Sequence, residues 1–319
     1  MSIWLVGAGP MAGFHADVLA DIGADVTIVA TSATRALPLA EKHGMAHYTQ
    51  GLMRALDALP RPDAAIVALP VDRLAGVALA LAQAGVPRIL LEKPGALRPD
   101  DLDPVCAAAR DTGSQVFVAY NRRFFAAVAE ARRRIAASDA VLSFSFEFCE
   151  NADQIAGLPT SDDIKQHWVI ANSSHVIDLA FHLCGLPQDW QHKVAGSLPW
   201  HTRGADFRGM GQTETGAAFS YFADWRGPGR WGLEIVLPQE RLFLRPMESL
   251  SVMRRGTFQA VPVAVDNTLD LAFKPGLHTQ MTGFLALDTG PELVRLDDQI
   301  TMMRDVYDPM AGYVGSAAQ

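Results

Sequence analysis

The feature that most constrains the fold is a glycine-rich turn close to the N-terminus. A short apolar run at residues 3–6 ends in Gly7-Ala8-Gly9-Pro10-Met11-Ala12, after which apolar side chains recur at helical spacing. Gly7 permits a tight turn, Gly9 lets a phosphate approach the backbone, and Ala12 is small enough for close packing of helix on strand. The pattern predicts a strand, a turn and a helix whose N-terminus offers unpaired N–H groups to an anion.

Glycine turns between strands and helices are common, so the neighbouring segments decide how this one is interpreted. Buried strands are predicted at 25–30, 64–69, 89–91 and 115–119, and helices around 35–43, 72–84 and 100–110. This alternation predicts a doubly wound parallel sheet of the Rossmann type, whose ligands bind at the carboxyl ends of the strands. We therefore expect a dinucleotide-binding domain over residues 1–121, with a purely structural turn as the alternative.

The end of the second predicted strand bears on which dinucleotide is bound. NAD-binding domains usually carry an acidic residue about 20 residues beyond the glycines, where it pairs with the ribose 2′-hydroxyl. This sequence instead has Thr31, Ser32 and Arg35, which could hold a 2′-phosphate through charge-assisted hydrogen bonds. We predict NADP as the preferred cofactor and NAD as the alternative. Thr31 or Ser32 could also serve simply as the N-cap of the next helix.

Composition limits the remaining possibilities. A chain of 319 residues exceeds the size at which one hydrophobic core stops growing, which predicts a second domain over residues 122–319. The net charge of −8 and the lack of a basic stripe argue against nucleic acid as a partner. No apolar run reaches about 18 residues and no signal peptide precedes the first strand, so we expect no membrane association. Three distant cysteines without CxxC spacing favour the cytoplasm and predict no structural metal.

Four motifs follow one another between Gly7 and Gly185, over more than half of the chain. After the glycine turn they are Ala68-Leu69-Pro70 with Leu90-Leu91-Glu92-Lys93-Pro94, then Ala119-Tyr120-Asn121-Arg122-Arg123-Phe124, then Ser174-His175-Val176-Ile177-Asp178-Leu179 followed by Leu183-Cys184-Gly185. In order and spacing they resemble the glucose-fructose oxidoreductase and inositol dehydrogenase family, Gfo/Idh/MocA.

The resemblance implies a Rossmann domain followed by an α+β domain with a large, mostly antiparallel sheet, which often forms homodimers or homotetramers. Strand-like patterns at 141–147, 215–222, 232–237, 241–244 and 249–254 agree with this outline. Turn chemistry and resemblance together predict these cofactor-binding residues: Gly7, Gly9, Pro10, Met11, Ala12, Thr31, Ser32, Arg35, Ala68, Leu69, Pro70, Glu92 and Lys93.

Oxidation of a secondary alcohol needs a group that accepts the hydroxyl proton. Lys93 lies just beyond the carboxyl end of a predicted strand, and the resemblance implies that its ammonium group polarises the reacting oxygen. His175 matches the family's proton-carrying or oxygen-binding histidine, and imidazole exchanges protons near neutral pH. A surface lysine and a core histidine are the structural alternatives. Asp178, on the same helix face as His175, is expected to orient or anchor rather than react.

One position departs from the family pattern. Many relatives carry an aspartate four residues before the histidine, where this chain has Ala171. Asn172 cannot act as a base. Either Lys93 and His175 suffice, a carboxylate such as Asp162 or Asp163 substitutes, or the chemistry differs. The predicted substrate-binding residues are Asn121, Arg123, Trp168, Asn172 and His175, each with a structural role as the alternative.

We therefore expect an enzyme that interconverts a hydroxyl and a carbonyl on a sugar, nucleotide sugar or cyclitol. The mechanism requires that the Gly7 turn and Lys93 converge on one dinucleotide, with the His175 helix closing over its reactive ring. A redox-neutral lyase or hydrolase with tightly bound NAD and a non-catalytic Rossmann redox sensor are the alternatives. His175, Asp178 and His182 share a helix face, but the proposed chemistry needs no metal there.

Overall fold

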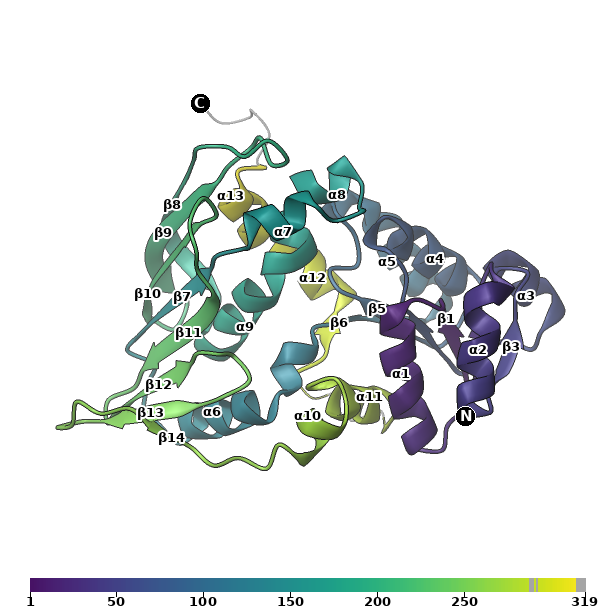
Figure 1. The fold of residues 1–319 in the computed structure, drawn as a ribbon, viewed down its shortest axis with the longest axis horizontal. Helices are drawn as coiled ribbons and strands as arrows, with labels where there is room; N and C mark the ends of the chain where they lie inside the picture. Colours follow the sequence, from purple (N-terminus) through teal and green to yellow (C-terminus); the bar gives the residue numbers. More distant parts are fainter. Residues whose placement is uncertain (287–289, 291, 314–319) are drawn as a thin grey trace. The chain divides into compact units, whose positions relative to one another are not determined.

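The computed structural model describes residues 1–286, 290 and 292–313 (Figure 1). These described residues divide into two compact units, one formed by 1–121 with the described part of 269–301 and the other by 122–268 with 302–313. Segment 269–301, which the sequence placed in a continuous second domain over 122–319, therefore packs with the first unit. Two contacts explain this: the Arg88 guanidinium donates to the carbonyls of Phe284 and Leu285, and residues 294–295 pair with the strand at 115–119.

The first unit contains a seven-stranded sheet in the order β15-β6-β5-β4-β1-β2-β3, parallel except for β15. Its strands are β1 (Ser2–Val6), β2 (Asp25–Val29), β3 (Ala46–Tyr48), β4 (Ala64–Val67), β5 (Arg88–Glu92), β6 (Gln115–Ala119) and β15 (Val294–Arg295). The order β3-β2-β1-β4-β5-β6 is that of a Rossmann sheet. The predicted doubly wound parallel sheet is confirmed.

The central strands are buried along almost their whole length, as expected for a parallel sheet with helices on both faces. All four residues of β4 are buried. Helix α1 contacts α2 and α11, whereas α4 contacts α5. The helices of this unit are α1 (Pro10–Asp21), α2 (Ala33–His43), α3 (Leu52–Ala58), α4 (Val71–Gln83), the short turn η1 (Pro99–Asp101), α5 (Asp103–Thr112), α11 (Leu277–Ala286) and α12 (Leu296–Met302), preceded by α10 (Thr268–Ala272).

The second unit contains an eight-stranded sheet in the order β14-β13-β12-β11-β7-β10-β9-β8. Its strands are β7 (Ser143–Phe148), β8 (Pro187–Ala195), β9 (Asp206–Thr213), β10 (Ala218–Asp224), β11 (Trp231–Val236), β12 (Glu240–Leu244), β13 (Ser251–Arg254) and β14 (Val261–Pro262). Only the β7–β10 pair is parallel, so the predicted mostly antiparallel sheet is confirmed.

Helix α9 (Ser174–Cys184) packs on β7 and β11 of this sheet. Its Phe181 ring meets Phe144, Phe146 and Phe219 edge to face, with centroids 5.3–5.9 Å apart. The other helices of the unit are η2 (Asn121–Phe124), α6 (Ala126–Ala136), α7 (Ala152–Ala156), α8 (Asp162–Gln166), the short π-helix η3 (Val169–Ser173), η4 (Met303–Tyr307) and α13 (Asp308–Ala311). Within the described part of the chain, no helix combines the length and apolarity needed to cross a membrane.

Candidate functional site

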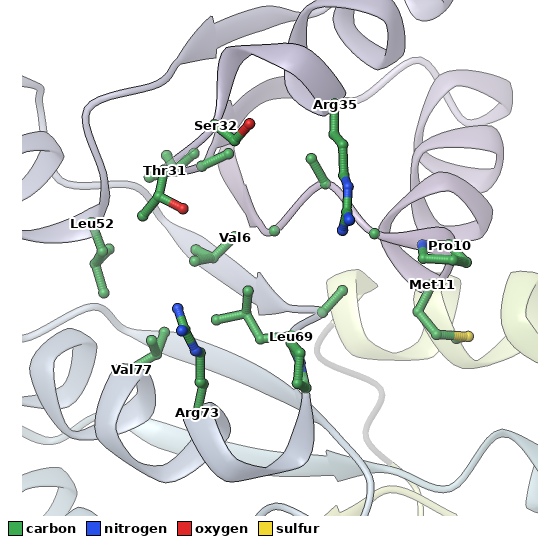
Figure 2. A pocket seen from close by; sticks show the side chains of 17 residues that line it. Val6, Pro10, Met11, Thr31, Ser32, Arg35, Leu52, Leu69, Arg73 and Val77 are labelled. Atoms are coloured by element: carbon green, nitrogen blue, oxygen red, sulfur yellow. The ribbon is translucent and has the colours of Figure 1, made fainter. Parts of the chain in front are cut away.

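A cavity of about 620 Å³ opens at the carboxyl ends of β1, β2 and β4 in the first unit (Figure 2). This volume is in the range of small-molecule and cofactor sites. The lining residues are Val6, Gly7, Ala8, Gly9, Pro10, Met11, Val29, Ala30, Thr31, Ser32, Arg35, Leu52, Ala68, Leu69, Pro70, Arg73 and Val77.

The two glycines of the turn have different reasons to be glycine. Gly7 has φ +123°, and a Cβ there would lie 2.3 Å from the carbonyl oxygen of Ala68. A Cβ on Gly9 would meet no protein atom within 4 Å. Gly9 is also the N-cap of α1, has no side-chain cap and is followed by Pro10 at the start of the helix. Its surroundings therefore leave open space beside unpaired helix N–H groups, an arrangement that fits the pyrophosphate of a dinucleotide.

This difference predicts opposite effects for two alanine substitutions. Gly7→Ala is expected to lower the stability of the first unit by about 1–3 kcal/mol or more. A side chain is strained at this positive φ, and its Cβ would overlap the carbonyl oxygen of Ala68. Gly9→Ala is expected to leave stability within about 0.5 kcal/mol and to weaken dinucleotide affinity by about tenfold or more, because its methyl group fills the space for the phosphate. Denaturant unfolding and NADPH titration would measure the two effects. An unchanged affinity in Gly9→Ala would contradict the phosphate site.

Ten of the thirteen residues predicted to bind the cofactor line this cavity. They are Gly7, Gly9, Pro10, Met11, Thr31, Ser32, Arg35, Ala68, Leu69 and Pro70. Ala12, Glu92 and Lys93 do not line it. Ala12 is completely buried in α1, and Oε1 of Glu92 lies 2.7 Å from Nε2 of the buried His15. Both side chains thus make internal packing or polar contacts.

Lys93 is half-buried and follows β5 directly. Since the sheet order is β5-β4-β1, one strand separates the end of β5 from the end of β1, a spacing of about 10 Å. Lys93 and the Gly7 turn therefore follow strands at the same edge of the sheet. The loop that begins at Lys93 is held by hydrogen bonds from buried Gln299. Nε2 of Gln299 donates to the Pro94 carbonyl at 2.8 Å and to the Tyr120 hydroxyl at 3.2 Å.

Arg73 was missed by the sequence reasoning. It lies in the first turn of α4, three residues after Pro70, and lines the cavity. The rule that ligands bind beyond the carboxyl ends of parallel strands could have singled it out, because α4 begins just after β4. The apolar lining residues Leu52 and Val77 were missed as well.

In the second unit, His175 lies in the first turn of α9 and is buried, with its ring centroid 6.1 Å from that of Trp231. Asp178 of the same helix is 1% exposed and accepts two hydrogen bonds from Arg123, Nε–Oδ2 at 2.7 Å and Nη2–Oδ1 at 2.6 Å. Arg123, predicted to bind substrate, thus forms a bidentate ion pair. The pair holds the Asp178 carboxylate in place, and the orienting or anchoring role expected of Asp178 stays a prediction.

Glu150, which sequence reasoning also missed, lies two residues beyond β7 and is buried. Its Oε1 accepts from Nδ2 of Asn172 at 3.0 Å and from Oγ of Ser173 at 2.7 Å. Both partners belong to η3, the turn that contains Ala171 and runs directly into α9. Asn172, predicted to bind substrate, therefore has its amide hydrogen-bonded to this carboxylate. The sequence offered one signal for Glu150, because this carboxylate comes shortly after the end of a predicted strand, at 141–147.

The two other predicted substrate residues also have internal partners. Nδ2 of Asn121 donates to the Pro275 carbonyl at 2.9 Å within the first unit. Trp168 meets Trp200 edge to face at 6.4 Å. The predicted substrate-binding roles of both residues stay predictions.

The electrostatic environment of α9 bears on the metal alternative. Burial, aided by the nearby Arg123 and Arg132, lowers the pKa of His182 to about 3, so this imidazole is neutral at physiological pH. Among residues 1–286, 290 and 292–313, no three His, Cys, Asp or Glu side chains are grouped to hold a metal ion. Burial also lowers the pKa of Arg122 to about 10; its guanidinium lies 4.7 Å from the Trp231 ring centroid.

Several known proteins are similar to this chain. Residues 1–120 match the model of the GFO_IDH_MocA family, described as an oxidoreductase family with an NAD-binding Rossmann fold. The structure is similar to UDP-N-acetylglucosamine 3-dehydrogenase from Acidithiobacillus ferrooxidans, with 18% identity, 98% of each chain covered and a TM-score of 0.74. No curated protein matches the sequence significantly.

Two further structures are similar over nearly the whole chain. Levoglucosan dehydrogenase, in complex with NADH and levoglucosan, shares 20% identity over 98% of this chain and 97% of that chain, with a TM-score of 0.77. An oxidoreductase from Agrobacterium radiobacter, in complex with NAD⁺, L-tartaric acid and magnesium, shares 15% identity over 98% and 97%, with a TM-score of 0.79. At these identities the likeness is one of fold. Together these findings show that residues 1–120 have a Rossmann fold matching the model of the GFO_IDH_MocA oxidoreductase family, and that the whole chain has the fold of these dehydrogenases and oxidoreductases.

Proposed function

We propose that this protein is a dehydrogenase that reversibly converts a hydroxyl group of a sugar, nucleotide sugar or cyclitol into a carbonyl, with NADP preferred over NAD. The observation that carries the proposal is the cavity beside the Gly7–Gly9 turn, which shares its sheet edge with Lys93. The match of residues 1–120 to an oxidoreductase family supports the reaction type. Two of the similar structures are a UDP-N-acetylglucosamine 3-dehydrogenase and a levoglucosan dehydrogenase. Their names support the substrate class.

The residues around the turn fit the cofactor. The N–H groups at the start of α1 would bind the pyrophosphate, and Thr31, Ser32 and Arg35 would contact the ribose and its 2′-phosphate. A nicotinamide dinucleotide held by these residues would supply hydride transfer to and from the carbon that carries the substrate hydroxyl.

The chain itself has to handle the hydroxyl proton. We propose that Nζ of Lys93 accepts it during alcohol oxidation and returns it during carbonyl reduction. His175 is proposed to hold the substrate oxygen or to pass the proton onward, because imidazole can exist in both protonation states near neutral pH. Neither step requires a metal ion.

Glu150 is proposed as the carboxylate that compensates for Ala171. It is a positioning residue: its hydrogen bonds to Asn172 and Ser173 fix the turn that leads into His175. Asp162 and Asp163, the substitutes proposed from the sequence, lie exposed on α8, and Asp163 pairs with His167 at 3.3 Å. A buried carboxylate that accepts hydrogen bonds from two residues of η3 is better suited to orient the helix that follows η3.

Glu150→Gln is expected to lower kcat by at least about tenfold, a fraction of a full acid–base contribution. It should also shift the pH dependence of kcat, because a neutral amide replaces a negative charge beside the histidine helix. Rates measured from pH 5 to 10 would test both effects. Asp162→Asn, the control, should leave both unchanged. Normal kcat and pH dependence in Glu150→Gln, or their loss in Asp162→Asn, would overturn this role.

The reaction itself is tested with purified protein. It should bind NADPH and, in the oxidative direction, increase absorbance at 340 nm when given NADP⁺ and a member of a panel of sugars, nucleotide sugars and cyclitols. Substrate conversion with no net change in reduced nicotinamide would instead indicate a redox-neutral enzyme. Cofactor binding without turnover of any compound would favour the sensor alternative.

A further inference from the structure

Two arginines point into the cavity from opposite walls. Arg35 extends from α2 and Arg73 from the first turn of α4, as Figure 2 shows. Both residues are exposed to solvent at the cavity. The walls that carry them lie beyond β2 and β4, on either side of β1. A ligand in the cavity would therefore lie between the two guanidinium groups.

The charge around these arginines is unbalanced. None of the seventeen residues lining the cavity is aspartate or glutamate. Within the described residues, neither guanidinium forms an ion pair or a hydrogen bond with another side chain. In contrast, Arg123 is paired with Asp178 and Arg208 with Asp206. Two unpaired guanidinium groups facing one cavity favour an anionic ligand.

The pyrophosphate of a dinucleotide does not account for both arginines. The Gly9–Met11 segment and the start of α1 already supply N–H donors for that group. In Figure 2, Leu52 and Val77 lie at the end of the cavity away from Pro10 and Met11, and they offer the apolar surface that an adenine base needs. Thr31 and Ser32 line the wall between these two regions, where a ribose would be placed.

We propose that Arg73 and Arg35 together bind the 2′-phosphate of NADP. Arg35 was predicted from the sequence, and Arg73 is the second guanidinium that would contact this phosphate. A phosphate monoester carries a charge of about −1.5 to −2 at pH 7, which two guanidinium groups match. Guanidinium also binds phosphate through paired, charge-assisted hydrogen bonds. This inference rests on the proposed function only in taking the ligand to be a nicotinamide dinucleotide.

The test uses two fragments that differ only in the phosphate at issue, 2′,5′-ADP and 5′-AMP. Their affinities are measured by isothermal titration calorimetry on the full-length protein at fixed salt. The native protein should bind 2′,5′-ADP at least about tenfold more tightly. Arg73→Ala should weaken 2′,5′-ADP by about 10- to 100-fold, the effect of removing a charge-assisted contact, and change 5′-AMP by less than about twofold. Arg35→Ala should behave in the same way.

Arg54→Ala is the matched control, because Arg54 is an exposed arginine of α3 in the same unit that does not line the cavity. It should leave both affinities unchanged. Equal losses of 2′,5′-ADP and 5′-AMP affinity in Arg73→Ala would mean that the side chain stacks on adenine, and would overturn the phosphate role. Equal affinities of the native protein for 2′,5′-ADP and 5′-AMP would also overturn the phosphate role. Because neither titration involves turnover, selective binding without any sugar oxidation would reject the proposed reaction and leave this site intact.

Discussion

Replacement of Lys93 by alanine is expected to reduce kcat by about 10²- to 10⁴-fold, the usual contribution of a positioned acid–base group. The substitution removes the only ionisable group proposed to exchange the hydroxyl proton directly. NADPH affinity should change much less, because Lys93 does not line the cavity that the cofactor is proposed to occupy. Steady-state rates and a fluorescence titration of NADPH would separate the two effects.

Lys42→Ala provides the control for charge and composition. Lys42 lies on α2 of the same unit, is 62% exposed and pairs with Asp17 at the surface. Its loss should alter neither rate nor cofactor affinity. A Lys93→Ala enzyme with a normal kcat would remove Lys93 from the mechanism, and the sensor alternative would gain support if His175→Ala were equally silent.

The second large effect is expected on stability. Asp178→Asn should lower the free energy of unfolding by about 3–5 kcal/mol, because it removes the buried carboxylate that pairs with the partly buried Arg123 guanidinium. Double replacement, Arg123→Met with Asp178→Leu, should recover part of this loss by removing both charges. Five of the six tryptophans lie in the second unit, so tryptophan fluorescence during urea unfolding reports mainly on the unit that contains the pair.

An exposed pair of the same geometry isolates the effect of burial. Arg226 donates to Asp224 through two hydrogen bonds of 2.7–2.8 Å, but the side chains are 52% and 40% exposed. Asp224→Asn should cost only about 0–1 kcal/mol, because water screens such pairs. If Asp178→Asn and Asp224→Asn lowered the free energy of unfolding by similar amounts, burial would not be the cause of the larger effect expected for the Arg123–Asp178 pair.

The sequence predicted the elements whose pattern is long and uniform. The buried runs of the parallel sheet and the alternating strands β7 and β10 to β13 were all located. Strand β3 has three residues and β15 has two, too few to establish a period. Strand β8 is largely polar and lies at the edge of its sheet, so it shows no apolar alternation.

The candidate site was predicted where a motif fixes the backbone and missed where side chains meet across the fold. Gly7 and Thr31 follow predicted strands, so their place at the cavity could be expected. Whether Arg73 faces Arg35 depends on how α2 and α4 are placed on the sheet, which no local pattern encodes. Glu150 and Asn172 are 22 residues apart in sequence, and only the packing of η3 beside the end of β7 joins them.

The return of residues 269–301 to the first unit has a consequence for biosynthesis. Strand β15, the Asn121 contact to Pro275 and the Gln299 contact to Pro94 all require residues that follow the second unit's sheet in the chain. At a translation rate of about 5–20 residues per second, Gln299 is made roughly 10–40 s after Asn121. The nascent Rossmann unit therefore leaves the ribosome without its edge strand and without the support of the Lys93 loop. A fragment ending at residue 121 would remain in that incomplete state, with one side of β6 unpaired and open to other chains.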